Sequence, residues 1–109
     1  MDYFKLLTRT IASVPAKAVI KLLDLECHML QSDFEHDRLA ASEDASSVLF
    51  FWRFLQMAKC GEVMHCVRPL PPDHIEFYKE TIVRLIQANE LPSSAMEQFD
   101  HAFQIPRHS

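Results

Sequence analysis

The chain has 109 residues, 49% of them apolar, and a formal net charge of −4 at pH 7. A chain of this length can form one domain whose core needs neither a cofactor nor disulfides. Its eleven lysine and arginine residues form no cluster, whereas a surface that binds nucleic acid or an anionic membrane requires one. We therefore expect neither nucleic acid nor a membrane as a partner.

A single glycine, Gly61, stands among long segments whose apolar residues recur every three or four positions. Strand-rich domains use glycine in hairpin turns and bulges, whereas helix interiors exclude it. The sequence therefore predicts an all-α fold, in which residues 1–109 form a single-domain bundle of four to five helices.

The first two predicted helices are separated by Ser13-Val14-Pro15, because proline suits the first turn of a helix but not its interior. The first runs from about Asp2 to Ala12, and the second from about Pro15 to Gln31. The second helix carries two apolar stripes: Ala16, Val19, Ile20, Leu23, Cys27 and Leu30 form one, and Ala18, Leu22, Leu25 and Met29 form the other. A helix that is apolar over most of its circumference must be covered on two sides. We therefore expect this helix at the centre of the assembled protein.

A polar interval at residues 32–42 can be a loop or a short helix that begins with a capping box at Ser32 and Glu35. The third predicted helix begins at Ser42 as its N-cap and has Lys59 in its last turn. Gly61 follows its end, which is a common position for glycine after a helix.

The C-terminal part of the chain predicts an extended connector over residues 62–72 and then two helices. The fourth helix covers about Asp73 to Asn89, with Asp73 and Glu76 at capping-box spacing. Ser94 opens the fifth helix after a short turn, so the two helices are expected to form an antiparallel hairpin. The tail at residues 105–109 is expected to fray.

A metal site is one hypothesis that the six histidines raise. Glu62 and His65 have the Glu-x-x-His spacing of di-iron helical bundles, and Cys66 and His36 could supply further ligands. The remaining ligands of a di-iron bundle are missing, and the cysteine spacing differs from that of a zinc knuckle. These four residues are weak candidates for a metal-binding helical protein or enzyme.

Catalytic motifs are absent from the sequence. Cys27 and His28 are neighbours on a predicted helix and point about 100° apart, so they cannot act on each other as thiolate and base. One glycine cannot supply a phosphate-binding loop. The residues do not decide whether the chain is an enzyme, but they favour a role without catalysis.

Three cysteines lie in or beside apolar segments, which is typical of reduced thiols in a cytosolic protein. The first residues contain no uncharged segment of signal-peptide length, and the longest apolar run, Val48 to Trp52, is too short to span a bilayer. We therefore expect a cytoplasmic protein.

Large apolar residues that lie off the main stripes are the remaining signal, namely Leu6, Leu49, Trp52 and Phe77. Aromatic and aliphatic anchors of this kind dominate the energetics of protein interfaces. Together with the missing catalytic motifs, they predict a small cytoplasmic interaction or regulatory module that presents an apolar helix face. The expected partner is a second copy of the chain, as a homodimer, or another protein.

Overall fold

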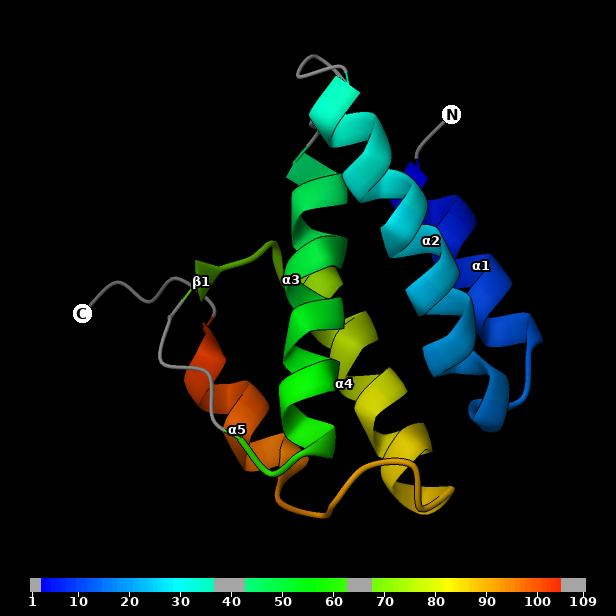
Figure 1. The fold of residues 1–109 in the computed structure, drawn as a ribbon. Helices are drawn as coiled ribbons and strands as arrows, with labels where there is room; N and C mark the ends of the chain where they lie inside the picture. Colours follow the sequence, from blue (N-terminus) through cyan, green and yellow to red (C-terminus); the bar gives the residue numbers. More distant parts are fainter. Residues whose placement is uncertain (1–2, 37–42, 63–67, 105–109) are drawn as a thin grey trace. The chain divides into compact units, whose positions relative to one another are not determined.

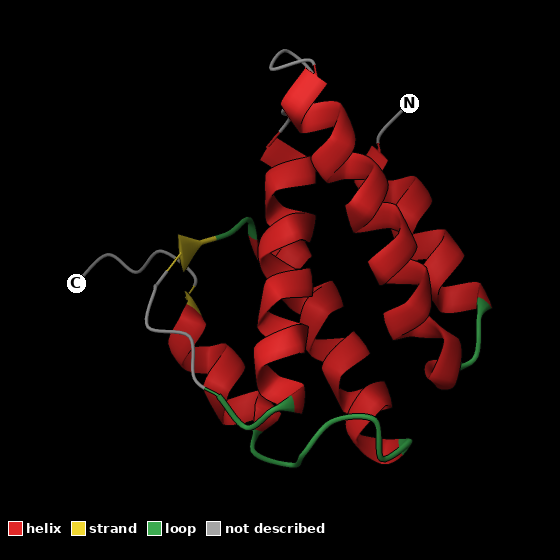
Figure 2. Cartoon of the chain, viewed as in Figure 1, coloured by secondary structure: helices red, strands yellow, loops and turns green. Residues whose placement is uncertain are grey.

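The computed structural model describes residues 3–36, 43–62 and 68–104, and these contain five helices and one pair of two-residue strands (Figures 1 and 2). In chain order the elements are α1 (Tyr3–Ser13), α2 (Ala16–His36), α3 (Glu43–Lys59), β1 (Arg68–Pro69), α4 (Pro72–Gln87), α5 (Ala95–Ala102) and β2 (Phe103–Gln104). The predicted all-α class is confirmed. The chain divides into two compact units, Met1–Arg53 and Phe54–Ser109, so that α3 begins in the first and ends in the second.

In the first unit, only Val14 and Pro15 connect α1 to α2, so the two helices run antiparallel side by side (Figure 1). Pro15 accepts a hydrogen bond at its carbonyl from the amide of Ala18 (2.9 Å), which starts the first turn of α2. The buried apolar side chains of this unit are Phe4, Leu7 and Ile11 of α1, Val19, Ile20, Leu23 and Cys27 of α2, and Ala45, Val48 and Phe51 of α3. One side of each helix therefore faces the interior.

Helix α2 continues to His36, so the first part of the polar interval at residues 32–42 is helical. Residues 32–36 contain neither glycine nor proline, and extending an existing helix adds one hydrogen bond for each residue. Residues 37–42 lie outside the described part of the chain.

The expected cover on both sides of α2 is wrong for the chain on its own. Leu25 and Met29 of the second stripe are 70% and 64% exposed, and Leu22 is half-buried. Of the other stripe, Val19, Ile20, Leu23 and Cys27 are buried, and Ala16 and Leu30 are half-buried. Helix α2 therefore buries most of one apolar stripe and leaves Leu25 and Met29 of the other open to solvent.

Helices α3 and α4 end in the same hydrogen-bonded motif. After α3, the amides of Gly61 and Glu62 donate to the carbonyls of Ala58 (3.1 Å) and Met57 (2.9 Å). After α4, the amides of Asn89 and Glu90 donate to the carbonyls of Ile86 (3.0 Å) and Leu85 (2.8 Å). This is the Schellman motif, and it needs a left-handed residue just after the helix, which is Gly61 (φ 74) in one case and Asn89 (φ 61) in the other. The sequence predicted both residues at these helix ends.

The predicted capping box at the start of α4 is wrong. The helix begins at Pro72 and its N-cap is Pro71, which makes no side-chain cap hydrogen bond, so that Asp73 lies inside the first turn. Proline suits the first helical position, which is Pro72, because its fixed φ is helical and an N–H there would have no partner within the helix.

In the second unit, α4 and α5 form the predicted C-terminal hairpin. Phe99 of α5 packs edge-on against Phe54 of α3 and Tyr78 of α4, with ring centroids 5.5 and 6.4 Å apart. Strand β1 pairs with β2 in parallel, Arg68 opposite Phe103 and Pro69 opposite Gln104. The sequence did not predict this pairing, because two residues are too few for an alternating pattern.

The two helix ends generate a prediction about stability. A left-handed conformation costs a residue other than glycine or asparagine about 1 to 2 kcal/mol, and a Cβ at Gly61 would meet no atom within 4 Å. We expect Gly61→Ala and Asn89→Ala each to lower the free energy of unfolding by about that amount, while Asn89→Gly leaves it unchanged or slightly raised. Urea unfolding of the three variants measures this, and equal stability of Asn89→Ala and Asn89→Gly would contradict it.

Candidate functional site

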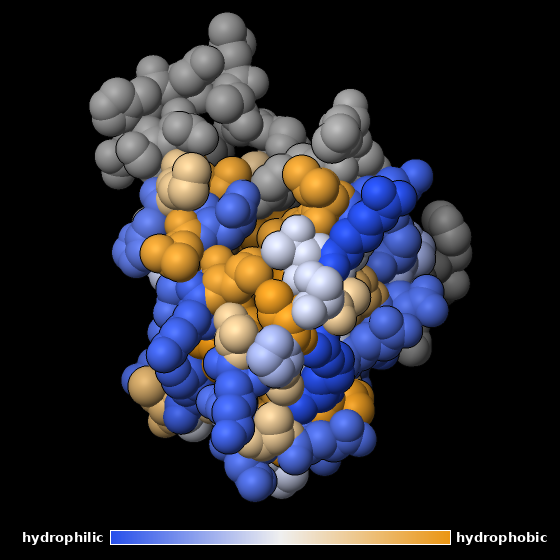
Figure 3. Space-filling view, turned by 90° about the vertical axis from the view of Figure 1, so that its right-hand side faces the viewer, coloured by the Kyte–Doolittle hydropathy of each residue, from blue (hydrophilic) through white to orange (hydrophobic). Residues whose placement is uncertain are grey.

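The most exposed large apolar side chains of the described residues belong mainly to the first unit. They are Leu6, Leu25, Met29 and Val83, of which only Val83 lies in the second unit. On the face that presents α1 and α2, apolar side chains gather in the middle, with hydrophilic side chains on both sides and below them (Figure 3). This is the arrangement expected of a surface that another molecule covers.

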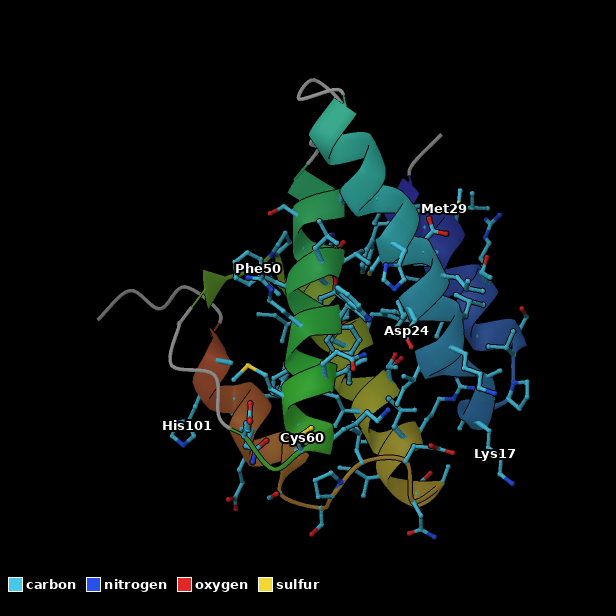
Figure 4. All side chains as sticks on the ribbon, in the orientation of Figure 1. Lys17, Asp24, Met29, Phe50, Cys60 and His101 are labelled. Atoms are coloured by element: carbon cyan, nitrogen blue, oxygen red, sulfur yellow. The ribbon has the colours of Figure 1, made fainter. Side chains whose placement is uncertain are left out.

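The α2 stripe, which we define as Ala18, Leu22, Leu25 and Met29, lies on the side of α2 opposite its buried residues. Leu25 is two residues after the buried Leu23 and therefore points about 200° away from it. Lys21 is exposed on one edge of the stripe, and Glu26 is half-buried on the other. In Figure 4, Asp24 faces α3, whereas Met29 lies on a different side of α2.

Trp52, the only tryptophan of the chain, connects α3 to α2 within the first unit. Its indole Nε1–H donates a hydrogen bond to the Asp24 carboxylate. The ring of His28 meets the indole edge-on, with centroids 5.7 Å apart. Trp52 is half-buried, and a buried indole generally needs an acceptor for its N–H. The Asp24 carboxylate provides this acceptor within the same chain.

The four residues that the sequence marked for an interaction surface differ in exposure. Leu6 is 50% exposed, whereas Leu49, Trp52 and Phe77 are half-buried. The Phe77 ring lies 6.0 Å from that of Tyr78 on the same helix. Leu25 and Met29 are more exposed than all four, and their signal was already present in the second apolar stripe of the sequence.

The candidate metal ligands are only partly described. Glu62 is exposed after the end of α3. His36 ends α2, but its side chain lies outside the described part of the chain, as do His65 and Cys66. Among the described residues, no group of three or more histidine, cysteine, aspartate or glutamate side chains could hold a metal ion. No arrangement of side chains among the described residues therefore supports the metal-site hypothesis.

Cys27 is a buried, free thiol in the interior of the first unit. Burial, together with the nearby carboxylates of Glu26 and Asp24, raises the pKa of the Cys27 thiol to about 12. A thiolate, not a thiol, is the nucleophile in cysteine chemistry. Cys27 therefore acts as a small apolar side chain of the core.

The second unit holds a few polar groups in its interior. His74 is buried, and its ring meets the Tyr78 ring edge-on at 6.2 Å. Thr81 donates its hydroxyl to the carbonyl of Phe77 (2.9 Å), and Gln98 Oε1 is buried with no hydrogen-bond partner among the described residues. These groups lie within the α4 and α5 hairpin and form no constellation of nucleophile and base.

Comparison of the chain with models of protein families, with curated proteins and with solved structures found no match. Among the described residues, no helix combines the length and the apolar character needed to cross a membrane. Leu25 and Met29 of the α2 stripe are the most exposed large apolar side chains of the described residues.

The Trp52 hydrogen bond generates the first prediction from this site. In a double-mutant cycle of Trp52→Phe and Asp24→Ala, we expect a coupling energy of about 0.5 to 1.5 kcal/mol, the net worth of one such hydrogen bond. Urea unfolding must be followed by circular dichroism, because Trp52→Phe removes the only tryptophan. Strictly additive single substitutions would contradict a direct contact.

Burial of Cys27 generates a second prediction. In a variant with Cys60→Ser and Cys66→Ser, we expect the remaining thiol to resist alkylation at pH 8 in buffer and to react fully in urea. A second variant that keeps only Cys60, which is exposed, provides the control and should react quickly without urea. Equal alkylation rates of the two folded variants would contradict the raised pKa and the burial of Cys27.

Proposed function

We propose that the chain is a protein–protein interaction module that binds its partner through an apolar face made by α2 and α1. The apolar face consists of Leu22, Leu25 and Met29 of α2 together with Leu6 of α1. The observation that carries the proposal is the high exposure of Leu25 and Met29 along one line of a helix.

Energetics support a role in binding. Fully burying a leucine or methionine side chain is worth about 1.5 to 3 kcal/mol relative to leaving it in water. Single exposed apolar residues are common on protein surfaces. Neighbouring ones at helical spacing, however, form the continuous apolar side with which a helix packs against another surface.

Leu6 extends the apolar face from α2 onto α1. Val14 and Pro15 form the turn between the two antiparallel helices. Leu6 lies eight residues before Val14 and residue 23 lies eight residues after Pro15, so Leu6 and residue 23 are at the same level of the hairpin. This level is between Leu22 and Leu25. A partner that covers the stripe of α2 lies at the level of Leu6, and contact with the exposed Leu6 side chain would enlarge the interface beyond one helix.

The state of the cysteines supports a reducing compartment such as the cytoplasm for this module. Cys27 and Cys60 are both free, and Cys60 is exposed. Exposed free thiols persist where glutathione and thioredoxin keep cysteines reduced.

The proposal is tested by photo-crosslinking in cells that produce the protein. A benzophenone amino acid at position 25 is expected to form a covalent adduct with a protein, because Leu25 is the most exposed residue of the apolar face. The matched control carries the same group at position 17, since Lys17 is exposed on a different side of α2. The mass of the adduct separates a second copy of the chain from another protein.

Adducts at position 25 that are missing at position 17 are the expected result. If position 25 forms no adduct with any protein, the apolar face is uncovered in the cell and the proposed function is wrong.

A further inference from the structure

We infer that the occupant of the apolar face is a second copy of the chain, whose α2 packs against α2 in parallel and in register. This inference rests on the proposed function and gives it a specific partner.

The spacing of the α2 stripe allows the helix to pack against a second copy of itself. Ala18, Leu22, Leu25 and Met29 follow one another at intervals of four, three and four residues. This is the repeat of a two-stranded coiled coil, in which apolar residues recur on average every 3.5 positions. In a parallel pair, each of these side chains meets its own copy across the two-fold axis.

The charges beside the stripe are complementary in a parallel pair. Lys21 and Glu26 directly flank the stripe on opposite edges, and both belong to the described surface of α2. A two-fold axis along the helices places the Lys21 edge of one copy against the Glu26 edge of the other. The two residues differ by five positions, roughly 7.5 Å along the helix, which a lysine side chain can span. Symmetry then produces this ion pair twice.

An antiparallel pair would bring like charges together. Its two-fold axis runs across the helices, so that the Lys21 edges of the two copies face each other, as do the Glu26 edges. Charges at such flanking positions set the orientation of paired helices. Of the two arrangements of this stripe, the parallel one is therefore favoured.

Glu26 can serve the partner in addition to its own chain. A carboxylate has two oxygens and about four lone-pair sites, so it can accept a partner's ammonium beside contacts within its own copy. Its half-buried position holds it next to the stripe, where less water screens the pair.

The contact is short, which sets the expected strength of the dimer. From Ala18 to Met29 the stripe extends roughly 16 Å along the helix, and Leu6 adds contact at its side. Interfaces that bury less than about 1,200 Å² in total are typical of weak or transient complexes. We therefore expect a dimer that dissociates on dilution.

Sedimentation velocity over a concentration series tests the inference with three charge variants of the full chain. The variants are K21E, E26K and the double substitution K21E/E26K. Each single substitution places two like-charge pairs at the interface of a parallel dimer, so we expect the dissociation constant to rise roughly tenfold. The double substitution exchanges the charges of both edges and is expected to restore the wild-type value to within about threefold. Circular dichroism checks that each variant is folded. Lys21 lies on the surface, whereas Glu26 is half-buried.

The outcomes separate this inference from the proposed function. Wild-type protein that stays monomeric at every concentration overturns the homotypic dimer, and a crosslink from position 25 to a different protein would then leave the proposed function standing. Dimerisation that neither single substitution weakens overturns the parallel arrangement. Wild-type dimers that are weakened by both single substitutions and restored by the double substitution support it.

Discussion

The constraint on which the structure of the first unit depends is that α2 has two apolar sides, of which the described residues bury only one. Val19, Leu23 and Cys27 are buried, whereas Leu25 and Met29 lie open to water on the opposite side. Turning α2 about its axis would only exchange one set for the other, because the two sets are about 200° apart. An uncovered apolar side is therefore built into the sequence of this helix, and its cost falls when another surface covers it.

The contact between Trp52 and Asp24 follows from how α3 meets α2. An indole that is partly removed from water needs an acceptor for its N–H, and Asp24 lies on the edge of α2 that faces α3. Trp52 thus belongs to the packing of its own chain, although its size and type also suit an interface anchor. The proposed interaction face accordingly includes Leu25 and Met29 but neither Trp52 nor Phe77.

Much of the local structure could be predicted from the sequence, because local chemistry decides it. Pro15 separates α1 from α2, and Gly61 and Asn89 follow α3 and α4 since few other residue types tolerate a positive φ. The capping box at Asp73 failed because Pro72 has helical φ and no N–H, so it can take the first helical position before any cap residue. The parallel pairing of β1 with β2 could not be predicted, since residues 68–69 and 103–104 are far apart in the sequence and each segment has only two residues.

The sequence by itself determined the all-α class, the order of the helices and the two apolar stripes of α2, since periodicity and turn residues act over a few neighbouring positions. Only the tertiary structure decided which stripe is buried and which of the large apolar residues stay exposed. The reason is that periodicity describes one helix at a time, whereas burial depends on which other helices are present to cover it. Leu23 and Leu25 are the same residue type on the same helix, and packing alone makes one of them core and the other surface.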